Sequence, residues 1–409
     1  MKRFLSLVLA MVMIFSISII TYAEDSEIEG NVIDELDPNV EMELSLEQAI
    51  EYALEHSRDM KIQDLDMKRA ELKYDQDRKV VKDYNKGKDY FDYVESLSRI
   101  ELEQEMEKGF IDSDILAILD QKEYFDLGIL ERQAKLSRQI SIWNKEIKEN
   151  EIKYNVEKAY FDLLQSEKDM EIAKEGLELT NRQYNQNRKM FELGNISYQQ
   201  LLSVELAVAQ SQSGLDMATV GYELQKMSFN NTLGFSLGQK VKLADKIEYK
   251  VYDEIDLEEA ITTAFENSVM LKVSKENYEL SELTFKAVRA KHSTPNQYKY
   301  REQEIAVEQA AKSLDTVKNG VEMSVRSAYY SLISAEKQIK TFEKAVENAE
   351  KAYELAELSY NLGQNTSNDV TRARIDIQDA KKNLSKQIHL YNLAILDFNY
   401  SIGLGKNTI

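Results

Sequence analysis

Apolar residues between 325 and 362 recur at intervals of three and four positions, the spacing of one face of a long α-helix. The pattern extends upstream to about residue 299, and an equivalent run in the first half of the chain begins near residue 129. Each run covers roughly 64 residues, or about 95 Å at the helical rise per residue. Shorter runs of about 54 Å follow at 198–233 and 367–402. Helices of this length cannot each surround a compact core, so the pattern predicts that they pack side by side, as in a coiled coil.

Two short interruptions separate each long run from the shorter one that follows it. The sequences MFELGNISYQQLL and SYNLGQNTSNDVT each place a glycine where a left-handed residue closes a helix. Three residues after the glycine stands a hydroxyl residue, and three residues later a polar residue completes a capping box. Both interruptions are therefore predicted to be the turns of αα-hairpins. The residues concerned are Gly194, Ser197 and Gln200 in the first turn and Gly363, Thr366 and Asp369 in the second.

The two hairpins are related by an internal duplication. A shift of 169 positions lays residues 156–234 over 325–403 without a gap, and about 16 of the 79 aligned positions are identical. A second match, of 44–57 with 255–268, needs a shift of 211 positions. The first copy is therefore longer than the second by 42 residues, which lie in the middle of the copy.

The duplication sets the expected domain boundaries. The first repeat covers 44–234, the linker 235–254, the second repeat 255–403 and a C-terminal tail 404–409. Within the linker, VKLADKIEYKVY alternates partly between apolar and polar residues, which predicts a short strand.

Residues 1–23 are predicted to be a signal peptide, followed by an N-terminal extension at 24–43. Lys2 and Arg3 precede an apolar run, and the run ends in a small-residue cleavage site at Ala23. The alternative is a retained membrane anchor, because an apolar run of about 17 residues is at the short edge of what spans a bilayer. Cleavage is the favoured interpretation, and it predicts an exported protein.

Composition excludes several classes of partner and site. The sequence holds 52 Lys and Arg residues against 72 Asp and Glu residues, a formal charge of −20, so nucleic acid is not an expected partner. No cysteine is present, which excludes disulfides, lipid attachment through cysteine and a Cys-type metal site. Only two prolines occur in 409 residues, which favours long helices.

No group of residues predicts catalysis. The three histidines, His56, His292 and His389, are far apart in the sequence and are expected to be surface or boundary residues. LGFSLGQK lacks the spacing of a phosphate-binding loop, and acidic clusters are better explained as solvated helix faces. The chain is therefore predicted not to be an enzyme and to need no cofactor or metal.

The order and spacing of these motifs resemble those of the TolC-like outer-membrane efflux protein family. The resemblance covers about 44–403 and rests on LSLEQAIEYALEHS at the start of a repeat, YFDLG before a long helix, and AYFDLL and AYYSLI inside the long helices. It rests also on LGNIS and LGQNT at the turns, and on NNTLG and NYSIG at the ends of the repeats.

The resemblance implies a homotrimer in which each subunit contributes two hairpins to a hollow cylinder of helices. It further implies a membrane-fusion adaptor that docks at the hairpin tips and an inner-membrane pump that supplies the energy. Asp369 lies one turn inside the second tip, where three copies would form a ring of carboxylates at the tunnel entrance, although a helix-capping role is favoured. The tip residues carried over are Gly194, Asn195, Ile196 and Ser197 together with Gly363, Gln364, Asn365 and Thr366.

The sequence departs from the family in the middle of each repeat, where family members carry two membrane strands. KHSTPNQYKYREQE in the second repeat is too short and polar for such strands and is predicted to be a turn between helices. The corresponding segment of the first repeat has charges on both alternating sets, which predicts helix and loop. Its aromatic residues are expected to pack between helices, and an interfacial cluster is the alternative. These residues are Tyr84, Tyr90, Phe91 and Tyr93.

We therefore predict an all-α fold of long antiparallel coiled-coil hairpins, duplicated in tandem and forming an oligomeric α-barrel, with β-barrel strands missing or vestigial. The leading functional hypothesis is the passive exit duct of a tripartite efflux pump or a type I secretion system. The alternative is an exported helical protein that tethers parts of the cell envelope and has no transport role. The expected location is the extracytoplasmic envelope; the resemblance implies the outer membrane, with membrane contact through partners.

Overall fold

The computed structural model describes residues 41–246, 248–249, 251–252, 255–292 and 294–404. The predicted signal peptide, nearly all of the N-terminal extension and nearly all of the C-terminal tail lie outside these residues.

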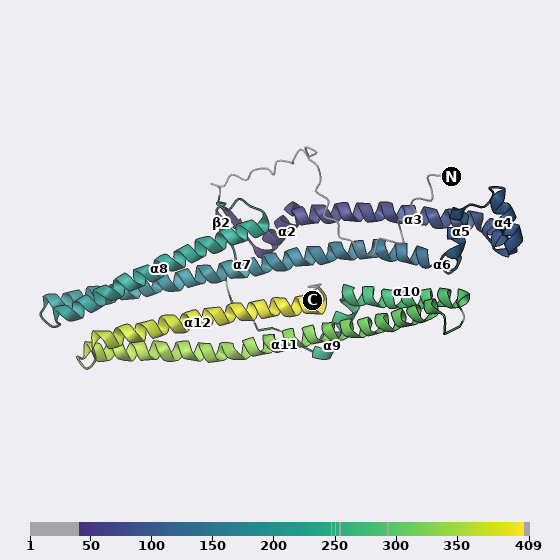
Figure 1. The fold of residues 1–409 in the computed structure, drawn as a ribbon. Helices are drawn as coiled ribbons and strands as arrows, with labels where there is room; N and C mark the ends of the chain where they lie inside the picture. Colours follow the sequence, from purple (N-terminus) through teal and green to yellow (C-terminus); the bar gives the residue numbers. More distant parts are fainter. Residues whose placement is uncertain (1–40, 247, 250, 253–254, 293, 405–409) are drawn as a thin grey trace. The chain divides into compact units, whose positions relative to one another are not determined.

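The elements follow the predicted order of long helices and turns (Figure 1). The first repeat contains β1 (Met42–Leu44), α2 (Leu46–His56), α3 (Arg58–Ser96), α4 (Arg99–Glu107), α5 (Ser113–Asp120), α6 (Lys122–Asp126), α7 (Ile129–Glu192) and α8 (Tyr198–Leu233). After β2 (Val241–Leu243), the second repeat contains α9 (Leu257–Asn267), α10 (Val269–Lys291), α11 (Tyr298–Asn361) and α12 (Ser367–Asn399), which ends in a π-helical segment, Tyr400–Leu404.

The predicted all-α class is confirmed, and so are the lengths of the principal helices. Both α7 and α11 contain 64 residues. The short strand expected in the linker is β2, which pairs in parallel with β1 so that Met42 lies opposite Val241. Among the described residues, none of the helices combines the length and apolar character that crossing a membrane requires.

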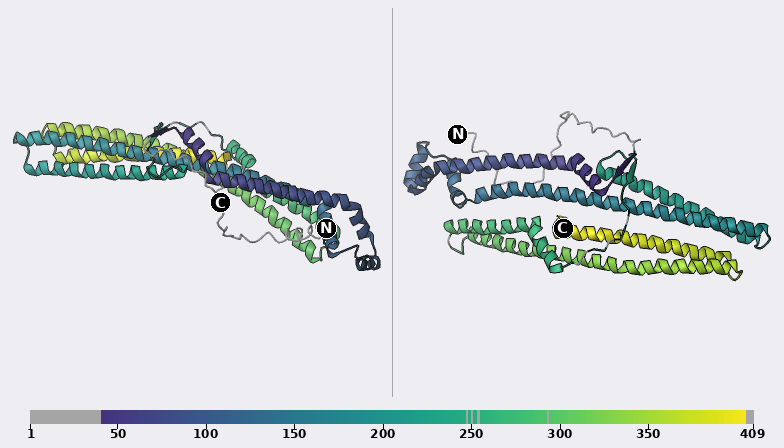
Figure 2. Two further views of the ribbon diagram at one scale, coloured as in Figure 1. Left: turned by 90° about the horizontal axis from the view of Figure 1, so that it is seen from above. Right: turned by 180° about the vertical axis from the view of Figure 1, so that it is seen from behind.

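The described chain divides into two compact units, and each is described separately. One unit contains the described residues of 41–69, 139–277 and 310–404, and therefore holds α8, α12 and all but the first residues of α7 and α11, the helices of the two hairpins (Figure 2). The other contains residues 70–138 and 278–309, including α4, α5 and α6.

Each hairpin in the first unit packs on its own apolar core. The core of the first repeat includes Val156, Leu163 and Phe229, and that of the second includes Val325 and Leu332. Val325 and Leu332 are the positions that the 169-residue shift aligns with Val156 and Leu163, and all four are almost fully buried. The two repeats therefore bury equivalent residues, although the domain boundaries themselves stay a prediction.

The short helices α2 and α9 complete these cores in the same way. Ala49 and Ala53 of α2 are buried against the first core, and Ala260 and Ala264 of α9 against the second. These pairs are related by the 211-residue shift. Small side chains at four-residue spacing let each short helix approach the long one closely.

In the second unit, the segments predicted to lack membrane strands form helices and turns. The residues between α10 and α11 make the predicted turn, and the corresponding part of the first repeat forms the end of α3 followed by α4. The prediction that the aromatic residues pack between helices holds for Tyr84 of α3, whose ring stacks on that of Phe125 in α6 with centroids 4.2 Å apart. Phe91 stacks on Tyr84 of its own helix, with centroids 5.3 Å apart. The prediction is wrong for Tyr90 and Tyr93, which are 42% and 53% exposed.

Replacing the glycine at either hairpin turn by alanine is expected to destabilise the protein by about 1–2 kcal/mol, because a side chain disfavours the left-handed conformation. Gly194 and Gly363 have φ of 76° and 75°. Gly214→Ala in α8 and Gly320→Ala in α11 are the controls. These glycines are helical and exposed, with open space around an added Cβ, so both substitutions should stabilise by up to about 1 kcal/mol. Urea unfolding of the four variants measures both effects, and equal effects at turn and helix positions would contradict the assignment.

Candidate functional site

The first hairpin tip, between α7 and α8, has the predicted cap geometry. The amide of Gly194 donates to the carbonyl of Phe191 at 2.9 Å, and the amide of Asn195 donates to that of Met190 at 2.8 Å. Ser197 then caps α8, because its Oγ accepts from the amide of Gln200 while its own amide donates to Gln200 Oε1. The tip is thus fixed by local bonds without help from a core.

The second tip, between α11 and α12, repeats this arrangement. The amide of Gly363 donates to the carbonyl of Tyr360 at 2.9 Å, and the amide of Gln364 donates to that of Ser359 at 2.9 Å. At the start of α12, the carboxylate of Asp369 satisfies the N-cap residue Thr366, whose amide and hydroxyl both donate to one carboxylate oxygen, at 2.9 and 2.7 Å.

The predicted tip residues lie together at these two turns, and nearly all are exposed. Gly194, Asn195 and Ser197 are exposed and Ile196 is half-buried, whereas Gly363, Gln364, Asn365 and Thr366 are all exposed. Asp369 is exposed and engaged in the cap, and hydrogen bonds from Thr366, helped by Arg372, lower the pKa of its carboxyl. The geometry supports the capping role, and the ring of carboxylates at a tunnel entrance stays a prediction.

Sequence reasoning missed the apolar residues that the tips expose. Leu193 is 76% exposed and Leu362, its partner under the 169-residue shift, is 65% exposed. Tyr198, directly after the first turn, is 61% exposed. The signal was present, because both leucines precede the turn glycine in the same register. Leucine at such an exposed turn has no packing role within the chain, which makes the pair a candidate contact with a partner.

Behind the tips, buried polar side chains join the two hairpins, beside buried apolar residues such as Val204 and Val370. The hydroxyl of Tyr360 on α11 donates to Asn187 Oδ1 on α7 at 2.6 Å, and both residues are buried. Gln183 Nε2 on α7 donates to the carbonyl of Ser367 on α12 at 3.3 Å. These contacts join the first hairpin to the second within one unit.

Arg374 of α12 is the most unusual member of this polar layer. Its residue is only 3% exposed, and its guanidinium donates to Ser211 Oγ at 3.4 Å and to Gln378 Oε1 at 3.2 Å. Its Nε has no hydrogen-bond partner, and among the described residues no carboxylate forms an ion pair with it. Burial lowers the pKa of this guanidinium, and an unpaired buried charge costs stability.

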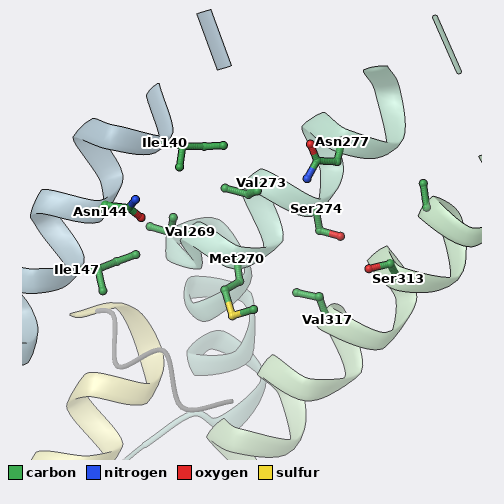
Figure 3. Close-up of a pocket in the computed structure, with 11 residues that line it drawn as sticks. Ile140, Asn144, Ile147, Val269, Met270, Val273, Ser274, Asn277, Ser313 and Val317 are labelled. Atoms are coloured by element: carbon green, nitrogen blue, oxygen red, sulfur yellow. The ribbon is translucent and has the colours of Figure 1, made fainter. Parts of the chain in front are cut away.

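A hollow of about 350 Å³ lies among α7, α10 and α11 (Figure 3). Ile140 and Ile147 of α7, Met270 of α10 and Val317 of α11 line it, with amides and hydroxyls between them. All the lining residues are uncharged, so the hollow is suited to apolar contact and offers no acid or base for catalysis.

A second hollow of about 320 Å³ contains carboxylates, including Glu157 of α7. The hydroxyl of Tyr400 donates to Glu157 Oε1 at 2.9 Å. Burial raises the pKa of this carboxyl, and the hydrogen bond and Lys153 only partly oppose the rise.

The histidines do not form a site. His56 stacks on Tyr52 with ring centroids 4.0 Å apart, and His389 Nε2 lies 3.0 Å from Asp162 Oδ1. Within the described part of the chain, no group of three or more metal-binding side chains is placed to hold an ion.

Comparison with known proteins identifies what the chain is similar to. The model of the family described as "Outer membrane efflux protein" matches residues 295–390, which cover α11 and most of α12. No curated protein matches the chain.

Several solved structures share the fold. The outer membrane protein VceC of Vibrio cholerae is 12% identical, with a TM-score of 0.63 over 88% of this chain and 96% of its own. The MtrE outer membrane channel of Neisseria gonorrhoeae, in its open state, is 13% identical, with a TM-score of 0.64 over 89% of this chain and 90% of its own. The CmeC outer membrane channel of Campylobacter jejuni is 14% identical, with a TM-score of 0.53 over 68% of each chain. At these identities the likeness concerns the fold.

Together, the family match over the second hairpin and the shared fold confirm the resemblance that the sequence predicts. The matched family and the named structures are channel and efflux proteins, which also confirms the prediction that the chain is not an enzyme.

Replacing the buried arginine of the polar layer by an apolar residue of similar length is expected to stabilise the protein. Arg374→Met removes an unpaired buried charge and should raise the free energy of unfolding by about 1–3 kcal/mol. The exposed Arg372, two residues earlier, supplies the matched control, and Arg372→Met should change stability by less than about 0.5 kcal/mol. A large loss of stability in Arg374→Met, measured by denaturant unfolding, would show that the charge has a partner.

Glu157→Gln is expected to make the protein more stable at neutral pH, because the amide oxygen still accepts from Tyr400 and the buried charge is gone. The folded-state pKa of Glu157 is raised, so the wild type loses stability as pH rises through that pKa. The difference between variant and wild type should therefore shrink as pH falls toward the ordinary pKa of glutamate. Thermal unfolding at several pH values measures this difference in stability. Glu146→Gln, the same substitution at an exposed position, is the control. A constant difference at all pH values would contradict the assignment.

Proposed function

Because the chain resembles TolC-like outer membrane efflux proteins in sequence and in fold, we propose that it is a subunit of a trimeric passive exit duct. In this proposal three copies place six hairpins side by side in a hollow cylinder. The cylinder serves a tripartite efflux pump or a type I secretion system in the extracytoplasmic envelope. Selectivity and energy come from an inner-membrane pump.

One observation carries the proposal: the first helices of the two hairpins, α7 and α11, are equal in length and end in matching turns. Each of these helices has 64 residues, and each turn uses a left-handed glycine and a capped second helix. Two equivalent hairpins side by side let each subunit continue the same packing to its neighbours, and such head-to-tail contacts close into a ring where the rotation between subunits permits it. A single-purpose tether would not need the second end.

The tips are proposed as the docking site of a membrane-fusion adaptor. Leu193 and Leu362 supply exposed apolar contacts at the two ends, and the polar turn residues beside them are exposed as well. Interfaces commonly combine a few apolar anchors with a polar rim, and the tips offer both. The three copies of Asp369 then lie at the entrance of the duct.

Imaging of the purified mature chain, residues 24–409, tests the duct. The expected result is a trimer by sedimentation and an open axial channel in electron-microscopic averages. A monomer, or a bundle with a filled centre, would contradict the proposal and favour the alternative of an exported helical tether.

The docking role predicts a specific defect for a tip variant. In a strain lacking the gene, the double variant Leu193→Ser with Leu362→Ser should accumulate ethidium as the empty strain does, while still forming trimers. Met323→Ser, a substitution at a 73% exposed position on α11, should restore low accumulation like the wild type. Equal export by the two variants would exclude the tip leucines as contacts.

A further inference from the structure

The 42 additional residues of the first repeat form a structure that the second repeat lacks. Between α3 and α7 lie the short helices α4, α5 and α6, whereas α10 and α11 are joined by a short turn. We call the region from Tyr84, near the end of α3, to Asp126, the last residue of α6, the cap. Its role is separate from the exit duct proposed above.

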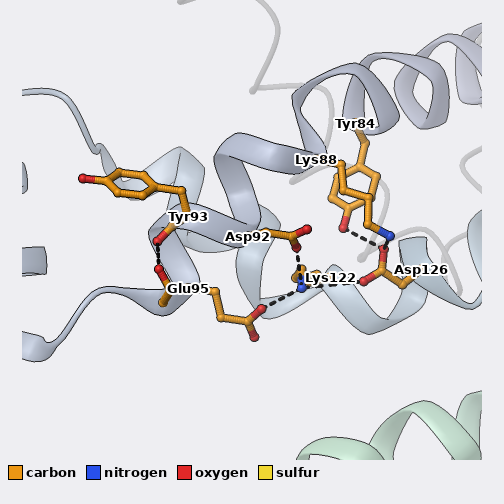
Figure 4. Close-up of polar contacts among 8 residues, drawn as sticks. Tyr84, Lys88, Asp92, Tyr93, Glu95, Lys122 and Asp126 are labelled. Carbon is orange, nitrogen blue, oxygen red and sulfur yellow. Dashed lines mark hydrogen bonds and ion pairs between the residues drawn. The ribbon is translucent and has the colours of Figure 1, made fainter.

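The cap is built on a buried charge cluster that joins α6 to α3 (Figure 4). Lys122 Nζ lies 2.8 Å from Asp92 Oδ1 and 2.6 Å from Glu95 Oε2, and 3.7 Å from Asp126 Oδ2. The side chain of Lys122 is only 15% exposed, and these carboxylates raise its pKa. Asp92 and Glu95 of α3 thus hold Lys122 of α6, and Asp126 of α6 pairs with Lys88 of α3, so ion pairs in both directions fix α6 against α3.

Aromatic packing beside this cluster strengthens the same joint. The rings of Tyr84 on α3 and Phe125 on α6 stack with centroids 4.2 Å apart, and the Tyr84 hydroxyl donates to Asp126 Oδ1 at 3.1 Å. Tyr84 and Phe125 are 5% and 7% exposed. The cap therefore has a small core of its own, which holds its outer residues in fixed positions.

On this base the cap exposes three neighbouring aromatic residues, the aromatic patch: Tyr90, Tyr93 and Phe110. Their exposed fractions are 42%, 53% and 67%. Tyr90 is joined to Phe110, because its hydroxyl donates to the carbonyl of Phe110 at 3.0 Å. Tyr93, three residues after Tyr90 on α3, points away from the Lys122 cluster (Figure 4).

Acidic residues adjoin the aromatic patch. The amide of Phe110 donates to the carbonyl of Glu105 at 3.1 Å, and Asp112, two residues after Phe110, caps α5 through its carboxylate. Burial raises the pKa of Tyr90, and Asp112 and Glu105 raise it further. Residues 89–114 contain nine acidic and two basic side chains. Both basic residues are already paired, Arg99 with Glu103 and Lys108 with Glu105.

We infer that the aromatic patch is a docking surface for a protein segment rich in arginine. Guanidinium groups stack on exposed aromatic faces and form charge-assisted bonds with carboxylates, and the cap presents both together. The acidic charge disfavours a second copy of the cap, which carries the same charge, and an anionic lipid surface. The inference stands on charge complementarity and is independent of trimer formation and of the tips.

Fluorescence anisotropy with defined peptides tests the inference on the mature protein. The probes are two labelled synthetic peptides with the same leucine positions, one with arginine and one with glutamate between them. The arginine peptide should bind at least about tenfold more tightly, and its affinity should fall as salt rises.

Matched variants separate the aromatic patch from the general negative charge of the chain. Phe110→Ser combined with Tyr93→Ser leaves the net charge unchanged and should weaken arginine-peptide binding about tenfold or more. Leu72→Ser on α3, at a residue also 67% exposed, is the control and should bind as the wild type does. Circular dichroism checks that all three proteins keep their helices.

Each other outcome overturns the inference. Equal binding by the patch variant and the control would show that attraction is not specific to the patch. Patch-dependent binding to phosphatidylcholine vesicles with no preference for arginine would assign the surface to lipid. Patch-dependent self-association in sedimentation would assign it to a second copy. The absence of any peptide binding by the wild type would leave the patch without its proposed ligand.

Discussion

Helices of this length are stable only where the apolar side chains of one run meet those of its neighbour along their length. In the first repeat that contact includes Val156 and Leu163 of α7 against Phe229 of α8, and the second repeat uses the aligned positions. Burying a side chain of this size contributes about 1.5–3 kcal/mol, so the sum over a hairpin depends on many modest contributions. The tips, the polar layer and the hollows are all features of this side-by-side packing.

Toward the tips, buried polar contacts are added to the apolar ones. Apolar packing is tolerant of sliding, whereas the bonds of Tyr360 to Asn187 and of Gln183 to Ser367 and Thr371 need their partners at fixed positions along the helices. A shift of one helix by a turn would leave these buried groups unpaired, at a cost of about 1–3 kcal/mol for each. The polar layer therefore specifies how the two hairpins are aligned, while the apolar cores supply most of the stability.

The sequence predicted the features that depend on local patterning. Helix lengths followed from three-and-four spacing, and the turns followed from Gly194 and Gly363 with their capping residues. The buried position of Arg374 was not predictable, because a charged residue on a helix is normally solvated and its burial depends on the neighbouring hairpin. The aromatic segment was predicted in part: Tyr84 packs as expected, but Tyr93 on the same helix is 53% exposed.

The parallel pair of strands bonds the start of the first repeat to the linker that follows its end. The amide of Met42 donates to the carbonyl of Lys240, and the amide of Ala244 donates to that of Leu44. Tyr160 of α7 reinforces this connection by donating from its hydroxyl toward Leu44 and Asp245. A polypeptide whose ends are adjacent can be copied head to tail without rearranging either copy. This adjacency gives a physical reason why gene duplication could produce the present chain from a shorter ancestor.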